Sequence, residues 1–203
     1  MPDERTRISR RRFLTGVAAG STVLGTLALT HTALPWGPFS LDEQRRRLDA
    51  PQQLPVNRSA REAGIRTGDI DDSWRLVLRR GERTVALSAA DLTALPQRTE
   101  ELPIACVEGW TATATWQGVR LSELMMLVGA APSDDLRLRS LQRRGAFGVT
   151  TMPATYVRDP LTLIALRVNG ERLSADHGYP ARVIAPGRPG VLQTKWLTEI
   201  EVI

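Results

Sequence analysis

The only cysteine of this 203-residue chain, Cys106, begins the stretch Cys106-Val107-Glu108-Gly109-Trp110. A thiolate is a soft, strongly donating metal ligand, and a neighbouring cation or metal lowers the pKa of the thiol and deprotonates it. One cysteine alone forms neither an intrachain disulfide nor a multi-cysteine zinc site. Two interpretations stay open at this point: a single-thiolate metal ligand, or a small buried apolar side chain.

A second group of chemically useful residues lies near the end of the chain, among glycines and prolines that fix unusual backbone conformations. His177, Arg182 and Lys195 fall within nineteen residues of one another. Arginine binds phosphate through paired hydrogen bonds, and lysine acts as a point charge. The pattern predicts an anion site suited to a phosphorylated cofactor. The alternatives are a structural hydrogen bond for His177, a solvated strand face for Arg182 and a surface position for Lys195.

The net charge of +5 is concentrated at the N-terminus. The first twelve residues hold five arginines and two acids, a net +3, which leaves only +2 for the remainder. The one later basic run, Arg45-Arg46-Arg47, is flanked by Asp42, Glu43 and Asp49. We therefore expect no basic groove for phosphates and no nucleic-acid partner.

The N-terminal residues have the pattern of an export signal. Ser9-Arg10-Arg11-Arg12-Phe13-Leu14 is a twin-arginine motif, and an uncharged run from Thr15 to Leu34 follows it. The alternative is an uncleaved membrane anchor, because about twenty uncharged residues just span a bilayer. Either interpretation places the domain in the periplasm or on the outer face of the cytoplasmic membrane. A lone thiol there is open to oxidation unless it is buried or metal-bound.

We predict three regions: a signal or membrane anchor at 1–34, a linker at 35–53 and one folded domain at 54–203. Within the domain, alternation over 74–79 predicts a half-buried strand, and Arg80-Gly81-Glu82 turns it into a return strand at 84–87. Ser88 and Asp91 have capping-box spacing ahead of a short helix that stops at Pro96. A strand then leads into Cys106.

The second half of the domain is predicted to hold one more helix and several strands. Leu121, Leu124, Met125 and Val128 recur at helical spacing, with Ser122 as N-cap, Gly129 as the stop and Met125-Met126 in the core. Strands are expected at 136–139, 161–168, 181–185 and 196–203, with a turn at Asn169-Gly170. In the last strand, Trp196, Thr198, Ile200 and Val202 are expected to share a face. The order of elements predicts an α+β fold rather than alternating βα units.

Four motifs together resemble the molybdopterin domain of the sulfite oxidase superfamily, over roughly residues 54–203. They are Cys106-Val107-Glu108-Gly109-Trp110, Asn169-Gly170-Glu171-Arg172-Leu173, His177-Gly178-Tyr179-Pro180-Ala181-Arg182 and Lys195-Trp196. The resemblance is closer to the bacterial exported branch, which includes the catalytic subunit of periplasmic protein-methionine-sulfoxide reductase. It implies a β-rich domain of mixed sheets and short helices that binds molybdenum through a single molybdopterin.

The resemblance also implies site residues. Cys106 corresponds to the molybdenum ligand. The positions that hold the pterin and its phosphate correspond to Asn57, Arg58, Ser140, His177, Arg182, Gln193, Thr194 and Lys195. Glu108, Trp110 and Tyr156 are candidate catalytic residues that line the substrate pocket. Their alternatives are an exposed loop acid for Glu108 and core positions for the two aromatic side chains.

The implied function is two-electron oxygen-atom transfer by an exported molybdenum oxidoreductase. Sulfite oxidases usually follow the cysteine with a Gly-Asn-Arg-like segment and place arginines around the substrate. This chain has Glu108-Gly109-Trp110 instead, which favours a sulfoxide- or N-oxide-like substrate. A sulfite dehydrogenase-like oxidase, a non-catalytic exported binding module and a membrane-tethered interaction domain are the alternatives. Since no haem or flavin site is indicated, electrons are expected to pass to or from a separate cytochrome or membrane redox subunit.

Overall fold

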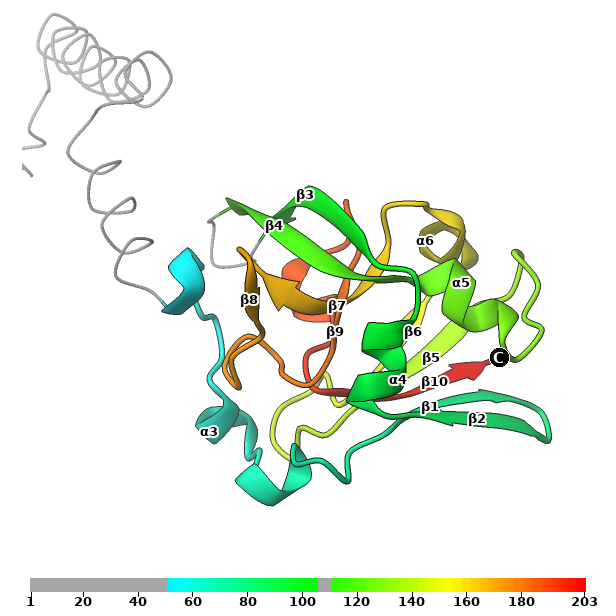
Figure 1. Cartoon of the computed structure of the whole chain (residues 1–203), viewed down its shortest axis with the longest axis horizontal. Coiled ribbons are helices and arrows are strands. Elements are labelled where there is room, and N and C mark those ends of the chain that lie inside the picture. Colours follow the sequence, from blue (N-terminus) through cyan, green and yellow to red (C-terminus); the bar gives the residue numbers. More distant parts are fainter. Residues whose placement is uncertain (1–50, 106–110) are drawn as a thin grey trace, which may run out of the picture. The chain divides into compact units, whose positions relative to one another are not determined.

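Two β-sheets organise the computed structural model, which describes residues 51–105 and 111–203 (Figure 1). These residues all belong to one unit, Asp49–Ile203. Cys106, Glu108 and Trp110 lie outside the described residues, as does the predicted export segment 1–34. Among the residues that are described, no helix is long and apolar enough to cross a membrane.

The first sheet has the strand order β2-β1-β10-β5-β6. β1 and β10 run parallel, and the other neighbours are antiparallel. Its strands are β1 (Leu76–Arg80), β2 (Arg83–Leu87), β5 (Leu136–Ser140), β6 (Val149–Met152) and β10 (Leu197–Val202). The predicted hairpin of β1 and β2 is present, with its turn at 81–82. The final strand of the chain therefore lies in the middle of the sheet and joins the two hairpins.

The second sheet has the order β3-β4-β7-β8, with β9 paired to β7 as well. All of its pairings are antiparallel. Its strands are β3 (Arg98–Ala105), β4 (Thr111–Arg120), β7 (Leu163–Val168), β8 (Glu171–Arg172) and β9 (Arg182–Ile184). β3 ends one residue before Cys106, and β9 begins at Arg182. The strand that precedes Cys106 and the strand that begins with Arg182 thus belong to the same sheet.

Short helices fill the connections, and their ends mostly follow the sequence signals. They are α3 (Ala60–Ala63), α4 (Ala89–Ala94), α5 (Leu121–Met126), α6 (Ala154–Arg158) and the 3-10 turns η1 (Pro51–Gln53), η2 (Thr67–Asp69) and η3 (Gly190–Leu192). The predicted capping box of Ser88 and Asp91 starts α4. The predicted Ser122 cap is wrong, because Ser122 lies inside α5 and Arg120 is the N-cap residue.

The main hydrophobic core lies between the two sheets, with α4 and α5 packed into it. A second core covers the other face of the second sheet and includes Leu54, Ile104 and Trp116. The first four residues of β7 are consecutively buried, as expected for a strand covered on both faces. Of the predicted core pair, Met125 is buried, whereas Met126 is 66% exposed.

β10 departs from the simple alternation that we expect for 196–203. Trp196 has a left-handed backbone (φ 51°) and stands before the strand. The register with β5 then shifts between Leu197 and Glu199. Leu197 and Ile200 consequently both enter the main core. The predicted shared face is confirmed for Ile200 and Val202, which both pack against this core, and is wrong for Trp196.

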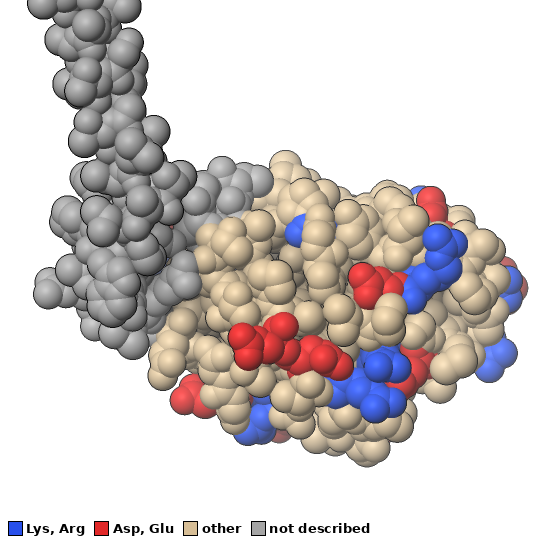
Figure 2. All heavy atoms as spheres, turned by 90° about the horizontal axis from the view of Figure 1, so that it is seen from above, with Lys and Arg blue, Asp and Glu red and all other residues tan. Residues whose placement is uncertain are grey.

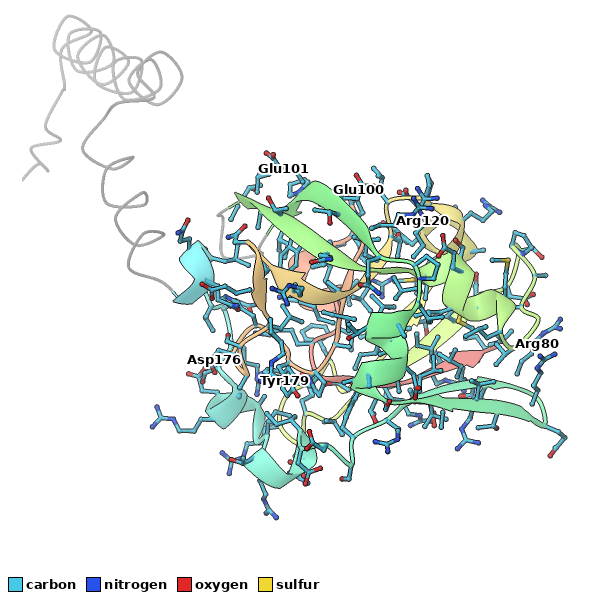
Figure 3. The ribbon with its side chains drawn as sticks, viewed as in Figure 1. Arg80, Glu100, Glu101, Arg120, Asp176 and Tyr179 are labelled. Carbon is cyan, nitrogen blue, oxygen red and sulfur yellow. The ribbon has the colours of Figure 1, made fainter. Side chains whose placement is uncertain are left out.

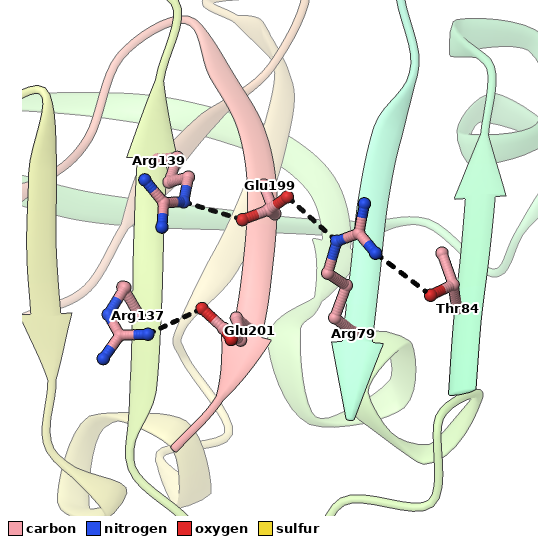
Figure 4. Close-up of polar contacts among 6 residues, drawn as sticks. All are labelled: Arg79, Thr84, Arg137, Arg139, Glu199 and Glu201. Carbon is pink, nitrogen blue, oxygen red and sulfur yellow. Dashed lines mark hydrogen bonds and ion pairs between the residues drawn. The ribbon is translucent and has the colours of Figure 1, made fainter. Parts of the chain in front are cut away.

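The outer face of the first sheet carries a network of ion pairs (Figure 4). Glu199 accepts hydrogen bonds from Arg79 at 3.0 Å and from Arg139 at 2.7 Å. Glu201 accepts one from Arg137 at 2.7 Å. On the molecular face seen in Figure 2, acidic and basic side chains likewise lie beside one another. The predicted α+β, β-rich fold is confirmed by these sheets and short helices.

Candidate cofactor site

A basic cavity of about 180 Å³ lies where the end of the chain meets residues 57–58. A smaller hollow adjoins it and shares Asn57, Arg182, Gly190 and Lys195 with it. Seven of the eight predicted cofactor-binding residues line the cavity or the hollow: Asn57, Arg58, His177, Arg182, Gln193, Thr194 and Lys195. The fold therefore brings together side chains from two ends of the domain.

Arg182 supplies a buried positive charge to this cavity. The residue is 5% exposed, and its pairing partner on β7 is Ala165, on the face of the second core. Its Nη1 donates to the carbonyl of His177 at 3.1 Å, while its buried Nε has no hydrogen-bond partner among the described residues. Burial lowers the pKa of Arg182 to about 9, so the guanidinium is still charged at neutral pH. The solvated-face alternative for Arg182 is wrong.

Lys195 is held by main-chain and side-chain oxygens. Its Nζ donates to the carbonyl of Arg58 at 2.5 Å, the carbonyl of Asp176 at 2.8 Å and Asn57 Oδ1 at 3.3 Å. These three acceptors match the three N–H groups of an ammonium. Burial, followed by repulsion from Arg182, lowers the pKa of Lys195 to about 7. Lys195 therefore contributes positive charge to the cavity when it is protonated, which a bound anion favours, and its hydrogen bonds tie the 57–58 segment to the 176 loop.

His177 links the same loop to the start of the domain. Its Nδ1 lies 2.9 Å from Gln52 Oε1 and 3.2 Å from Ser174 Oγ, and its Nε2 lies 3.0 Å from the carbonyl oxygen of Leu54. Burial and then the charge of Arg182 lower the pKa of His177 to about 4, so the ring is neutral at pH 7. A neutral ring has one N–H, so it donates to one of these two acceptors: to the Leu54 carbonyl, with Nδ1 accepting from the Ser174 hydroxyl, or to Gln52 Oε1. The structural hydrogen bonds that we weighed as the alternative role are therefore present at His177, on the wall of the hollow.

Two glycines allow the close approach of these segments. Gly178 has φ +103°, and a Cβ there would lie 2.9 Å from Lys195 Cβ. Gly190 packs against the last described residue of β3, since a Cβ at Gly190 would lie 2.6 Å from the carbonyl oxygen of Ala105. Ile104, two residues before Cys106 in the sequence, lines the hollow together with His177, Arg182 and Lys195.

The other predicted site residues have different positions. Gln193 and Thr194 are buried in the cavity wall, and Gln193 Oε1 has no partner among the described residues. Ser140 lines neither space, but its Oγ donates to the carbonyl of Lys195 at 2.7 Å and so positions that residue. Tyr156 also lines neither space. It packs against the main core and under Arg188, as the core alternative for this aromatic side chain expects.

Sequence reasoning missed three supporting residues. Trp116 lies under the Arg182 guanidinium. Arg188, 3% exposed, donates from Nε to the carbonyl of Leu192 and from Nη2 to that of Thr151, which fixes the 186–193 loop. Gln52 fixes His177. The Gly and Pro residues around Arg188 mark this loop in the sequence, whereas nothing local to Gln52 marks its role.

The residues present fit the anionic part of a cofactor. Arg58, Arg182 and Lys195 surround the space, and the nearby Asp176 carboxylate already accepts the Ala60 N–H at 2.8 Å. A buried guanidinium without a carboxylate is costly unless an anion neutralises it. Arg182 Nε and Gln193 Oε1, which have no partner among the described residues, would be satisfied by a ligand that both accepts and donates hydrogen bonds, as a phosphorylated pterin does.

Known proteins with similar sequences support this interpretation. A family model described as oxidoreductase molybdopterin binding domain matches residues 63–203. Mitochondrial sulfite oxidase of Drosophila melanogaster is 28% identical over 156 residues, covering 64% of this chain and 27% of the relative. Nitrate reductase [NADH] of Volvox carteri is 36% identical over 103 residues, covering 45% and 12% respectively.

Two bacterial proteins are also similar to this chain. YedZ1 of Azospira oryzae, whose name describes a protein-methionine-sulfoxide reductase subunit, is 30% identical over 113 residues, covering 55% of this chain and 42% of the relative. The sulfane dehydrogenase SoxCD of Paracoccus pantotrophus shares the fold, with a TM-score of 0.58, 24% identity and coverage of 64% of this chain and 38% of that one. The chain thus spans less than half the length of each of these proteins.

The family match covers most of the described domain, and the residues of the basic cavity fit the cofactor that the family binds. The chain therefore belongs to the oxidoreductase molybdopterin binding domain family, within the sulfite oxidase superfamily, whose cofactor is molybdenum-bearing molybdopterin.

Proposed function

We propose that this protein is an exported molybdenum oxidoreductase that reduces a sulfoxide- or N-oxide-like substrate. The substrate gains two electrons and two protons, its S–O or N–O bond breaks, and the oxygen leaves as water. The observation that carries the proposal is the buried Arg182 guanidinium, which has no carboxylate partner among the described residues and lines a hollow together with Ile104, two residues before Cys106.

The chain's own residues have separable tasks in this proposal. Arg182, whose Nε–H has no partner among the described residues, binds the anionic part of the cofactor by hydrogen bonds. The N–H groups of Lys195 already donate to protein oxygens, so Lys195 acts through its charge. Cys106 is the proposed thiolate ligand. When bound, the cofactor supplies a metal centre that exchanges two electrons. The protein fixes the position and surroundings of that centre.

The choice of substrate follows from the sequence around Cys106 and from the relatives. Glu108-Gly109-Trp110 replaces the arginine-containing segment typical of sulfite oxidases, which disfavours a small dianion such as sulfite. YedZ1 of Azospira oryzae is named for methionine sulfoxide reduction. A sulfite dehydrogenase-like activity is the second candidate, because mitochondrial sulfite oxidases are among the similar proteins. We propose Glu108 and Trp110 as substrate contacts.

The cofactor assignment is tested by metal and pterin analysis of the full chain, produced in cells that synthesise molybdopterin. We expect near-stoichiometric molybdenum and pterin in the native protein. Cys106→Ser is expected to lose molybdenum while keeping much of the pterin, whereas Arg182→Met is expected to lose the pterin. Equal molybdenum in native protein and Cys106→Ser, or none in either, would contradict the assigned ligand, and the latter result would favour a non-catalytic binding module.

The reaction is tested with a reduced viologen dye as electron donor and a panel of sulfoxides and N-oxides. Sulfite with ferricyanide as electron acceptor tests the opposite direction. We expect dye oxidation with at least one sulfoxide or N-oxide and no sulfite-dependent ferricyanide reduction. The reverse outcome would assign the sulfite dehydrogenase-like function.

Export and electron supply are part of the same proposal. We propose that the twin-arginine motif directs the folded, cofactor-loaded protein out of the cytoplasm and that a separate cytochrome or membrane redox subunit supplies electrons. Replacing both Arg11 and Arg12 with lysine should retain the protein in the cytoplasmic fraction. Export of that variant at the native level would contradict the proposed route.

A further inference from the structure

The loop that carries His177 and Arg182 also borders a second cavity, of about 700 Å³. Tyr179 and Pro180 line it, together with residues of α4, β4, β7 and β8. Tyr179 is labelled in Figure 3 on the segment that leads towards β9. None of the residues that line this second cavity lines the basic cavity or its adjoining hollow. It is a separate space that the proposed function does not use.

Small side chains explain why this space is hollow. α4 presents Ala89, Ala90, Thr93 and Ala94 to it, and Leu166 and Pro180 add apolar surface. The polar part of the lining is formed by Gln97, Gln117, Arg167, Arg172 and Tyr179. An apolar region beside a few polar and charged groups is the usual composition of a small-molecule site.

Two arginines face each other at this cavity. Arg167 on β7 and Arg172 on β8 are direct partners in the antiparallel register. Like charges in this arrangement destabilise a sheet. The intervening Asn169-Gly170 turn has φ values of 49° and 81°, the left-handed pair of a tight two-residue hairpin, and it holds the two strands in this register.

No carboxylate in the described part of the chain neutralises this pair. Arg167 Nη2 donates to the carbonyl of Gly170 at 2.5 Å, and the Arg172 guanidinium lies 4.8 Å from the centroid of the Tyr179 ring. Glu171, the neighbouring acid, is instead contacted by the Gln52 amide at 3.4 Å. Two exposed cations thus lie together at the edge of an apolar space, with no anionic partner among the described residues.

We propose that this second cavity binds a small organic anion, a carboxylate or sulfonate with an apolar body. Arg167 and Arg172 hold the acid group through charge-assisted hydrogen bonds. The α4 alanines, Leu166 and Pro180 cover the apolar body, and the amides of Gln97 and Gln117 lie at its edge. The site does not depend on the molybdenum cofactor or on the proposed reaction.

The test uses the full chain and naphthalene-2-sulfonate as the probe, with naphthalene-2-methanol as the neutral analogue, in titrations followed by calorimetry and by amide NMR shifts. We expect the sulfonate to bind at least tenfold more tightly than the alcohol. Arg167→Gln and Arg172→Gln should each weaken sulfonate binding about tenfold or more. Arg158→Gln, an exposed arginine on α6, is the matched control and should bind as the native protein does.

A measurement without the probe separates a ligand site from a structural pair. If the two charges repel each other in the empty site, Arg167→Gln should melt at a higher temperature than the native protein, while Arg158→Gln should not. Weaker binding together with a raised melting temperature supports the proposal. Equal binding of sulfonate and alcohol, native affinity in both cavity variants, or NMR shifts confined to other surfaces would overturn it.

Discussion

The guanidinium of Arg182 lies over the ring of Trp116, with 5.1 Å between the guanidinium carbon and the ring centroid. This aromatic face and one carbonyl oxygen are the groups that the described chain offers to a charge that is only 5% exposed. A cation–π contact offsets only part of the cost of taking a guanidinium out of water. The cofactor-free protein is therefore expected to be destabilised at this residue.

Replacing Arg182 with methionine should separate stability from cofactor binding. Without cofactor, we expect Arg182→Met to unfold at a higher urea concentration than the native protein. Its free energy of unfolding should be about 1 kcal/mol larger, because a buried charge with no carboxylate partner among the described residues is removed. The cofactor content of the same variant should fall to near zero. Arg158→Met, at an exposed position, should change neither quantity. A cofactor-free variant that is clearly less stable than the native protein would show that Arg182 is a purely structural residue.

The lowered pKa of Lys195 predicts a pH dependence. Burial lowers this pKa from 10.5 to about 7 in the folded protein. Between these two values the unfolded chain binds a proton that the folded chain has lost, so the stability of the cofactor-free protein should rise with pH across this window. Urea unfolding at pH 7.5 and 8.5, both below the Arg182 pKa of about 9, measures the effect, and Lys195→Met should remove it. The His177 pKa of about 4 lies outside the window.

Sulfate binding should show the opposite pH dependence. A dianion in the basic cavity favours protonated Lys195, so sulfate should raise the melting temperature of the cofactor-free protein more at pH 6 than at pH 8.5. Sulfate keeps its charge over this range, unlike phosphate. Sodium chloride of equal ionic strength is the control, because general screening affects exposed charges throughout the molecule. An equal response to both salts would indicate that the cavity does not bind anions.

Gly190 should tolerate no side chain. A Cβ there would lie 2.6 Å from the Ala105 carbonyl oxygen, so Gly190→Ala must push η3 away from the end of β3. We expect a loss of about 2 kcal/mol in unfolding free energy and a lower cofactor content. Gly68→Ala is the matched control, since a Cβ at Gly68 would meet nothing within 4 Å. Its stability should stay within about 0.5 kcal/mol of the native value.

The ion pairs on the outer face of the first sheet should differ in strength. Glu199 bridges Arg79 and Arg139, whereas Glu201 pairs only with Arg137 among the described residues (Figure 4). Glu199→Gln is therefore expected to cost about 1 kcal/mol and Glu201→Gln about half as much, since exposed pairs contribute little individually. In 1 M salt, the two variants should have nearly the same free energy of unfolding, because salt screens the ion pairs. If the two variants still differed in stability in high salt, side-chain packing rather than ion pairing would be the cause.

Local signals in the sequence predicted much of the fold. The capping box of Ser88 and Asp91, the turn at Asn169-Gly170 and the β1–β2 hairpin each depend on residues close together in the chain, and each is present. The backbone of Trp196 could not be predicted in this way. Its left-handed conformation is accompanied by a hydrogen bond from its Nε1 to the carbonyl of Ala175, which is a tertiary contact.

The candidate site was predictable in composition but not in its internal contacts. Six residues that line the basic cavity were predicted through the family resemblance, because its motifs occur together in order, whereas Gln142, Phe147 and Val191 in the same wall were not predicted. The stacking of Arg182 on Trp116 depends on β4 and β9 both pairing with β7, which no local pattern encodes. For the same reason, the sequence did not reveal that His177 contacts Gln52 and Leu54 rather than facing solvent.

The contacts of His177 determine how far the N-terminal side of this domain can be truncated. Leu54, Asn57 and Arg58 help to line the basic cavity and its hollow, yet all three precede residue 63, where the family match begins. A shortened protein that started at that boundary would leave the His177 ring without two of its oxygen neighbours and would open the side of the cavity. The family match therefore marks a shorter unit than the one that must be expressed to keep the binding site closed.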